Sequence, residues 1–567
     1  MNANVKLLLI LAFLGLRNIG FAQSSYIATD EDSYHLISRY RLSHPEMYSD
    51  ATSIRPFYRA DLTNLLYAPK HLTHRKDLSH SDRFNYGFLY DDNWDELPFD
   101  TAIRSIYLHA GRKRKARPFD LFYEYRNAFF SVDEKDFRLI VNPVFDLKYG
   151  KDMTDDQVVY RNTRGLELRG SIDNKVGFYT FMSENQYRYP NAYDAWVDDY
   201  RAVPGAGFLK SFGAGARDFL VARGYITVSP AKQISVQFGH DRNFIGNGYR
   251  SLILSDFAKE NLFLKFTTKV WRIQYMNLFS EYTDRSSSVQ GKKYGALHYL
   301  NLNILPGKLD IGVFEHILFV RNNSGYEANY LNPIIFYRTV EHGLNSTDNA
   351  VLGMDFRLIP VKKLMFYGQF VLDEFHKDEL VNRTHSWVNK WAAQLGGLWI
   401  DVAGIRNLDW RVETNLVRPY TYTHLLPSQA YTQYNQSLAH PIGSNFKEVL
   451  TVLKYQPLPR LTLTAKYFHI IHGADSTFSE QTTHFGGNLL SSYENRPKDS
   501  GIFIGDGVKE TIGLIDVALS FQIKHRTFFD LRYINRDNKR DQPLVSDRVH
   551  MVSFGFRMNI DRQNFDF

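Results

Sequence analysis

The sequence predicts an all-β transmembrane protein: an antiparallel outer-membrane β-barrel of about 18 strands (roughly 16–20) with a small N-terminal α-helical periplasmic domain. Three observations support this prediction. The chain begins with an export signal, apolar and polar residues alternate over long stretches, and short turns alternate with long connections. The predicted parts are a signal peptide at 1–23, a helical periplasmic domain with a basic connector at 24–118, a plug or extra strand at 119–136, and the outer-membrane barrel with long extracellular loops at 137–567.

The N-terminal segment has the features of a secretory signal peptide. Lys6 precedes the apolar block Leu7–Leu16, and small residues at Gly20 and Ala22 precede Ser24. This block is about half as long as the roughly 20 residues that a membrane-spanning helix needs. Since no later apolar stretch approaches that length, we expect export without a transmembrane helix in the mature chain.

The composition excludes several classes of protein. Among 567 residues, 68 Lys and Arg face 61 Asp and Glu, and this weak basic excess does not indicate nucleic-acid binding. Aromatic residues make up 15% of the chain while the mean hydropathy is only -0.36, which excludes disorder and indicates an amphipathic, aromatic-rich structure. The absence of cysteine excludes disulfides, thiol nucleophiles, cysteine-ligated metal sites and a lipidated N-terminal cysteine.

A two-residue period begins near Phe137 and continues to the end of the chain. Turns such as Asp173–Lys175, Thr267–Lys269 and Pro306–Lys308 join runs of about ten residues that we predict to be strands. The other connections are longer: 150–163, 188–218, 241–260, 280–292, 321–349, 374–390, 418–445, 473–510 and 537–547. This asymmetry is typical of a transmembrane barrel, with short periplasmic turns and long extracellular loops. A soluble sandwich with an aromatic core is the alternative, but the opposite strand faces are too polar for it.

The segment before the barrel lacks this alternation. Tyr34–Tyr40, Pro56–Leu66 and residues 80–92 are predicted to be short helices, the second started by its proline. The basic run Gly111–Pro118 is interpreted as a connector in solvent or in the lumen, and contact with anionic lipid or an acidic polymer is the alternative.

Motifs of enzymes and metal sites are mostly missing. The sequence has no phosphate-binding loop, dinucleotide fingerprint, nucleophile elbow or zinc-protease helix. The pairs His71/His74 and His469/His472 and the aspartates of 152–156 have commoner explanations than metal binding, so we predict neither a metal nor a cofactor. A hydrolase stays an alternative because a Ser/His/acid site is recognised by its geometry and not by residue order.

Aromatic residues gather in two of the predicted loops. They are Tyr193, Trp196 and Tyr200 in one loop, and Tyr420, Tyr422, Tyr431 and Tyr434 in the other. Aromatic faces stack on the apolar faces of sugars while neighbouring polar groups bind the hydroxyls. Packing between loops and occlusion of the lumen explain the same composition equally well.

Three stretches carry a resemblance to a known family: RNFIGNGYRSLILSDF at 242–257, YLNPIIFYR with HGLNSTDNAVLGMDF within 330–356, and GGNLLSSYENRP at 486–497. They resemble the Wzi-type capsule-assembly outer-membrane proteins, in particular the branch of the gliding-motility protein RemB. The resemblance implies a monomeric barrel of eighteen strands, closed by inward-folded loops and a small periplasmic helical bundle. It also implies a surface lectin for exopolysaccharide.

The same resemblance supplies candidate site residues, with the loops at 242–257 and 330–356 expected inside the lumen. The candidates are Arg242, Asn247, Tyr249, Arg250, Asp256, Tyr330, Asn332, Arg338, Glu341, Asp348, Asn349, Tyr493 and Arg496. Two interpretations stay open for them: contact with polysaccharide, or a salt-bridged plug, because charges near a low-dielectric wall need partners.

The predicted function is therefore that of a non-enzymatic outer-membrane barrel that binds or organises surface exopolysaccharide. One alternative is a structural subunit of a gliding-motility or protein-secretion complex of the envelope, and a second is an outer-membrane hydrolase. The expected partners are outer-membrane lipid with lipopolysaccharide, surface polysaccharide and envelope proteins, and no nucleic acid is expected.

Overall fold

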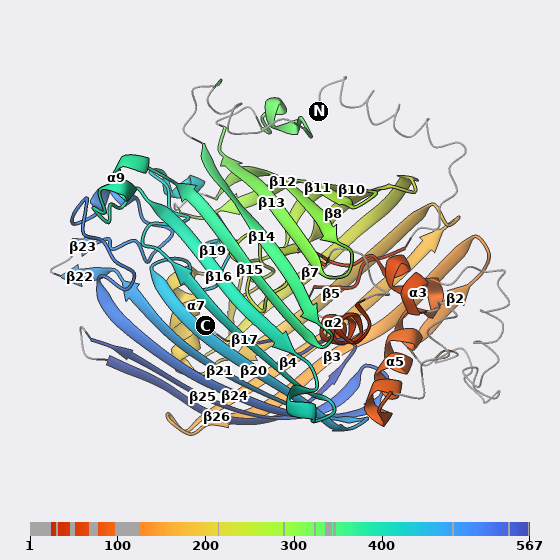
Figure 1. The fold of residues 1–567 in the computed structure, drawn as a ribbon. Helices are drawn as coiled ribbons and strands as arrows, with labels where there is room; N and C mark the ends of the chain where they lie inside the picture. Colours follow the sequence, from red (N-terminus) through yellow and green to blue (C-terminus); the bar gives the residue numbers. More distant parts are fainter. Residues whose placement is uncertain are drawn as a thin grey trace.

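The computed structural model describes residues 24–29, 32–45, 52–66, 78–96, 125, 127–213, 215–286, 290–321, 325–334, 343, 348–478, 481–541, 545–564 and 566. The predicted signal peptide and the basic run at 111–118 lie outside these described residues, as do Arg338 and Glu341. The described chain forms one large barrel with short helices packed at one end (Figure 1).

Within the described residues, eighteen antiparallel strands form the wall, each hydrogen-bonded to the next one along the chain. They are β3 (Phe137–Asp152), β4 (Gln157–Ile172), β5 (Val176–Arg188), β7 (Ala216–Ala231), β8 (Ile234–Asp241), β10 (Asn261–Val270), β11 (Ile273–Asp284), β12 (Gly291–Leu305), β13 (Leu309–Phe319), β14 (Asn349–Val361), β15 (Leu364–Glu374), β16 (Lys390–Trp399), β17 (Leu408–Val417), β20 (Phe446–Leu458), β21 (Leu461–Ala474), β24 (Val508–Lys524), β25 (Thr527–Arg540) and β26 (Val545–Met558). The last strand pairs with the first, with Phe554 opposite Tyr149, and this pairing closes the barrel. The predicted antiparallel barrel of eighteen strands is confirmed.

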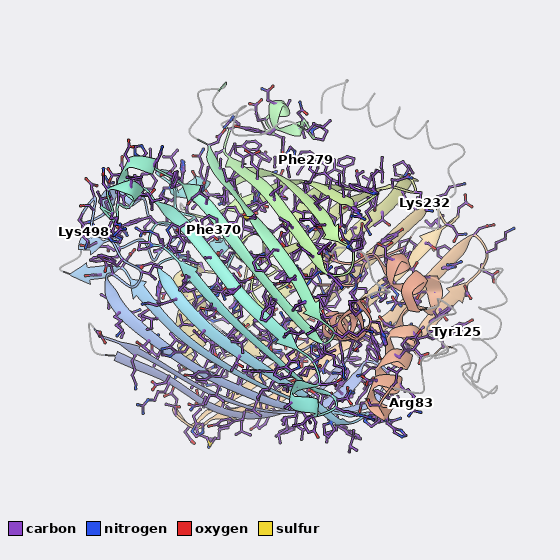
Figure 2. All side chains as sticks on the ribbon, in the orientation of Figure 1. Arg83, Tyr125, Lys232, Phe279, Phe370 and Lys498 are labelled. Carbon is purple, nitrogen blue, oxygen red and sulfur yellow. The ribbon has the colours of Figure 1, made fainter. Side chains whose placement is uncertain are left out.

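Alternation along each strand separates an apolar outside from a polar inside. Leu395 and Phe554 point outward and are 57% and 63% exposed, whereas Glu167, Arg169 and Asp355 point inward and are buried. Figure 2 shows side chains projecting from both faces of the wall. A soluble protein hides its apolar side chains, so this inverted pattern is that of a wall whose outer face meets lipid.

Several strands extend further than predicted. The predicted loop at 150–163 is a tight turn, because β3 and β4 stay paired up to Asp152 and Gln157. The predicted connection at 537–547 is likewise occupied mostly by β25 and β26, and the turn predicted at 267–269 falls instead at Trp271 and Arg272. These extensions could not be predicted from the sequence. Beyond the apolar belt, one face of a strand meets water and the other the polar lumen, so apolar and polar residues no longer alternate there.

The three predicted helices are present as α2 (Ser33–Ser43), α3 (Arg59–Leu66) and α5 (His80–Asp92), but the second begins at Arg59 and is not started by Pro56 as predicted. A capping box between Ser79 and Asp82 starts α5. The helices lie at the end of the barrel that carries the short turns, here called the short-turn end (Figure 1). No helix in the described part of the chain is long and apolar enough to cross a membrane.

Short elements lie at the ends of the barrel, in its lumen and against its wall. They are β1 (Ile54–Arg55), η3 (Trp94–Glu96), β2 (Phe130–Asp133), α7 (Asn191–Tyr200), β6 (Lys210–Phe212), β9 (Phe244–Ile245), η4 (Ala328–Leu331), α9 (Lys377–Val381), η5 (Val402–Gly404), η6 (Pro427–Gln429), β18 (Thr432–Gln433), β19 (Gln436–Ser437), β22 (Ser476–Phe478), β23 (Gln481–Thr483) and η7 (Tyr493–Asn495). β2 extends the wall by pairing with β3. β1 pairs with β9 inside the barrel, so the N-terminal segment and the connection after β8 meet in the lumen.

Candidate functional site

The connection after β8 folds into the lumen, as predicted, and is held there by charged groups of the wall. The backbone N–H groups of Tyr249 and Arg250 donate to the Glu413 carboxylate, and the Arg250 guanidinium lies 3.3 Å from Glu448 and 3.0 Å from Asp566. Asp566 belongs to the C-terminal tail, which returns into the barrel after β26 (Figure 1). Attraction by Arg250 and Lys466 outweighs burial and lowers the pKa of Asp566.

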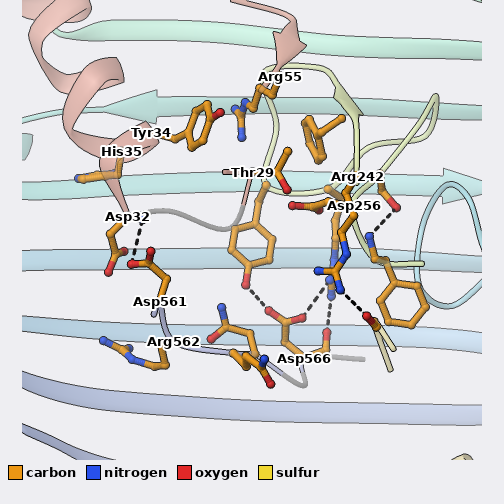
Figure 3. Close-up of a pocket in the computed structure, with 18 of the residues that line it drawn as sticks. Thr29, Asp32, Tyr34, His35, Arg55, Arg242, Asp256, Asp561, Arg562 and Asp566 are labelled. Atoms are coloured by element: carbon orange, nitrogen blue, oxygen red, sulfur yellow. Dashed lines mark hydrogen bonds and ion pairs between the residues drawn. The ribbon is translucent and has the colours of Figure 1, made fainter. Parts of the chain in front are cut away.

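The other predicted residues of this connection also have partners inside the protein. Asn247 accepts a 2.5 Å hydrogen bond from Thr52 and donates to Ser53, both in the N-terminal segment. Tyr249 contacts Asp566, and Arg242 lies 3.7 Å from Glu260. Arg242 and Asp256 line an internal cavity (Figure 3). These contacts match the interpretation of the connection as a salt-bridged plug.

The predicted placement of 330–356 in the lumen is wrong for its first residues. Tyr330 is fully buried against Phe279, Ile317 and Phe319, which lie on the outward faces of β11 and β13. The Tyr275 hydroxyl, also on the outer wall, donates to the carbonyl of Pro333. The described segment 325–334 thus crosses the outside of the barrel, above β11–β13 in Figure 1, because an aromatic patch on the wall receives it.

The other described candidate residues of that connection, Asn332, Asp348 and Asn349, have different surroundings. Asn332 is exposed, and its side-chain oxygen accepts a hydrogen bond from the backbone N–H of Ile334. Asp348 is buried and anchors the segment, since it accepts hydrogen bonds from the Tyr330 hydroxyl at 2.8 Å and from Arg321 at 2.7 Å. Asn349 instead donates to the carbonyl of Gln429 in the connection 418–445.

The tyrosines predicted in 418–445 pack inside the barrel. Tyr422 and Tyr431 are fully buried, their rings stack at 5.3 Å, and their hydroxyls donate to the carbonyls of Leu252 and Ile253. Tyr420 donates to the carbonyl of His484, and the Tyr434 hydroxyl accepts from Arg285. This geometry gives these tyrosines a role in joining loops, and sugar contact by them stays a prediction.

The predicted aromatics of 188–218 lie on α7. Tyr193 is buried beside Arg536, whereas Trp196 and Tyr200 are half-buried and stack at 4.3 Å with an interplanar angle of 17°. Burial raises the pKa of Tyr200 to about 12, so its hydroxyl is neutral at physiological pH. The stacked pair is a flat aromatic surface.

A second aromatic surface lies at the long-loop end, the end opposite the helices. Trp387 from the connection 374–390 and Tyr493 from 473–510 have ring centroids 4.7 Å apart, and Arg496 lies 4.2 Å above the Trp387 ring. Lys390 lies 4.3 Å from the Tyr493 ring and 5.2 Å from the Trp387 ring. We call these four residues the rim cluster. Trp387, Tyr493 and Arg496 are partly exposed, whereas Lys390 is buried, so the cluster offers an aromatic face and one cation to solvent.

The loops that form the rim cluster hold each other in place. The Trp387 backbone N–H donates to the carbonyl of Asp499, and Arg418 donates to the carbonyls of Ser386 and Ile502. His424 lies 6.4 Å from the Tyr493 ring, and burial, with Lys390 nearby, lowers its pKa, so this imidazole is neutral at pH 7.

The sequence prediction found half of the rim cluster, Tyr493 and Arg496, and missed Trp387 and Lys390. Trp387 is a single tryptophan in a short connection, so it gives no signal of clustering. Only the pairing of two loops that are about a hundred residues apart brings it to Tyr493. The described residues contain no group of three or more His, Asp or Glu side chains able to hold a metal ion.

A closed antiparallel barrel with an apolar outer wall and a plugged polar lumen defines the class of outer-membrane β-barrel proteins. The family model of the capsule assembly protein Wzi matches residues 149–533. The chain therefore belongs to the Wzi capsule assembly family. A comparison with curated protein sequences gives no match.

One solved structure supports the fold, and two others are reported for comparison. The chain is similar to Wzi of Escherichia coli, described as an outer-membrane protein involved in group 1 capsule assembly and as a carbohydrate-binding β-barrel, with 13% identity, a TM-score of 0.56, and 95% of this chain and 100% of that chain covered. Pseudomonas aeruginosa OprD has 9% identity and a TM-score of 0.41 over 74% of this chain and 95% of that one. Acinetobacter baumannii OccAB2 has 11% identity and a TM-score of 0.40 over 74% and 97%.

Proposed function

We propose that this outer-membrane barrel binds a surface polysaccharide at the rim cluster and holds it there during capsule assembly, without a catalytic step. The observation that carries the proposal is the half-exposed pair Trp387 and Tyr493, with the partly exposed Arg496 above the Trp387 ring and the buried Lys390 beside the Tyr493 ring. Aromatic faces cover the apolar C–H faces of sugar rings, while charged and hydroxyl groups at their edges bind hydroxyls or carboxylates.

The orientation in the membrane is part of this proposal. Barrels of this class have short turns on the periplasmic side and long loops on the extracellular side. The rim cluster then faces the cell surface, where a capsule lies, and the helices α2, α3 and α5 face the periplasm. The stacked pair Trp196 and Tyr200 belongs to the same long-loop end and supplies a second contact for an extended polymer.

Lipopolysaccharide is the expected lipid partner at that surface.

Membership in the RemB branch is a second and separate proposal, supported by the three sequence stretches alone. It implies contact with motility or secretion proteins of the envelope, and co-purification of such proteins from the native membrane in mild detergent is its test.

The main proposal is tested with full-length protein in detergent and exopolysaccharide isolated from the source cells. We expect Trp387→Ala and Tyr493→Ala to weaken binding about tenfold each, which corresponds to about 1.4 kcal/mol. The matched control is Trp399→Ala, because Trp399 is another partly exposed tryptophan but lies on the outer wall at the short-turn end.

Heat-modifiable migration on a gel shows that each variant is a closed barrel. Binding that is unchanged in both rim variants, or equally reduced in the Trp399 control, would contradict the proposal.

A further inference from the structure

The N-terminal segment and the connection after β8, which both enter the lumen, leave a cavity of about 390 Å³ between them. The N-terminal segment with α2 forms one side, the connection after β8 forms the other, and the C-terminal tail completes the lining (Figure 3). This volume falls within the roughly 300–1,000 Å³ of pockets that hold small ligands. Membership in the Wzi family does not by itself assign a function to this cavity.

The lining has an excess of positive charge, with eight Lys and Arg side chains against five Asp. Four of these aspartates have cations of the protein as partners. Asp32 lies 3.2 Å from Lys454, Asp561 3.4 Å from Arg526, and Asp566 3.0 Å from Arg250. Asp409 is bound by Arg39 and His35. The excess therefore resides in the arginines that these acids do not neutralise.

Arg55 is one such arginine. Its guanidinium lies 5.0 Å from the Tyr34 ring and 4.7 Å from the Phe244 ring, and it points toward the cavity (Figure 3). Within the described residues it has neither a carboxylate within 4.0 Å nor a hydrogen-bond acceptor, and its Nε atom is buried without a partner. Burial, with Arg411 nearby, lowers its pKa, and this outweighs the opposite effect of Asp256, the fifth aspartate of the lining, which lies more than 4.0 Å away.

Arg411 is the second. It lines the same cavity, and its Nη1 donates to the carbonyl of Asn247 at 3.0 Å and to the Tyr367 hydroxyl at 3.2 Å. In the described part of the chain no carboxylate lies within 4.0 Å of it. Two guanidiniums that share one cavity, and are held in place by aromatic rings and neutral acceptors, leave N–H groups available for a planar, bidentate anion.

We propose that this cavity binds a carboxylate-bearing sugar, with Arg55 and Arg411 holding the carboxylate and the Tyr34 and Phe244 rings packing beside the sugar. The inference rests on the proposed function, because it takes a saccharide as the ligand and adds acidity to its description. It places this site in the lumen, apart from the rim cluster. A buried cation without a carboxylate in direct contact is costly, and an anionic ligand lowers that cost.

The test uses full-length protein in detergent and three probes: glucuronate, its neutral methyl ester and glucose. Titration calorimetry should show glucuronate bound at least tenfold more tightly than the ester or glucose. Arg55→Gln and Arg411→Gln should each abolish this preference for the acid. Arg548→Gln, at the exposed end of β26 far from the cavity, is the control and should leave it unchanged.

Two separate variants, Arg55→Gln and Arg411→Gln, are used in case one of them does not fold. Heat-modifiable migration on a gel identifies a folded barrel. Equal binding of glucuronate and its ester, or a preference that survives both arginine substitutions, overturns the proposal. Polysaccharide binding measured in the same preparations separates this failure from that of the main function. If polysaccharide binding still depends on Trp387 but glucuronate is not preferred, only the cavity proposal fails. If glucuronate is preferred but polysaccharide binding does not depend on Trp387, the rim cluster proposal fails and the cavity proposal stands.

Discussion

The two ends of this barrel are closed by different chemistry. At the short-turn end, the Arg39 guanidinium of α2 contacts three carboxylates at once, those of Asp82, Asp401 and Asp409. At the long-loop end, side chains join the loops by donating to neutral carbonyls, as in the hydroxyl bonds of Tyr422 and Tyr431 at 2.6 and 2.7 Å and the bonds of Arg418 to Ser386 and Ile502. These contacts of the helical end therefore pair opposite charges, whereas those of the loop end combine aromatic packing with hydrogen bonds to neutral acceptors.

Aromatic residues therefore have two different roles in the loops. Buried tyrosines such as Tyr431 use ring and hydroxyl to hold the loops, and they leave no surface for a ligand. Trp387 and Tyr493 keep their rings partly exposed on the scaffold that those tyrosines build. We expect substitutions in the first group to lower stability and substitutions in the second to lower affinity.

The largest effect is expected at the ionic end. Arg39→Ala leaves three carboxylates without their shared cation, at a cost of about 3–5 kcal/mol. The helical segment should detach from the wall, so limited proteolysis should cleave it much faster than in the wild type, while β3–β26 stay closed. Arg83→Ala on the exposed face of α5 is the control. Equal cleavage of the two variants would show that the ionic contact does not hold this end.

A smaller effect is expected at the aromatic end. Tyr431→Phe removes the hydroxyl that contacts Ile253 and His316, and leaving these buried groups unsatisfied costs about 1–3 kcal/mol. The thermal unfolding midpoint should fall. Tyr467→Phe, at an exposed tyrosine of the outer wall, should change stability by less than about 0.5 kcal/mol. Equal unfolding midpoints for the two variants would show that the hydrogen bonds of the Tyr431 hydroxyl do not stabilise the barrel.

The smallest effect concerns pH at the ionic end. Burial, with Asp95 beside it, raises the pKa of Glu96 from 4.5 to about 7. The folded state then binds more protons than the unfolded state between these values, so stability should fall as pH rises through this window, by about 1 kcal/mol or less for a partly exposed group. In Glu96→Gln this part of the pH dependence should be absent, and an unchanged profile would contradict the assignment.

The barrel could be predicted from the sequence because a bilayer on one side and a polar lumen on the other impose a period of two. Strand ends could not, since the extensions at Asp152 and Gln157 lie where that contrast ends. The loops at 242–257 and 330–356 had similar polar composition, yet the first enters the lumen while Tyr330 packs on the outer wall. Their placement depends on contacts between distant residues, such as Asn247 with Thr52, which no local pattern contains.

The central claim is that exposed aromatics at the long-loop end hold the polysaccharide. Its most direct test is the amount of exopolysaccharide that stays on washed cells carrying both Trp387→Ala and Tyr493→Ala, compared with cells carrying Trp399→Ala at equal protein levels. We predict that the polymer is released into the medium from the first cells and retained by the second. Retention by both would contradict the claim.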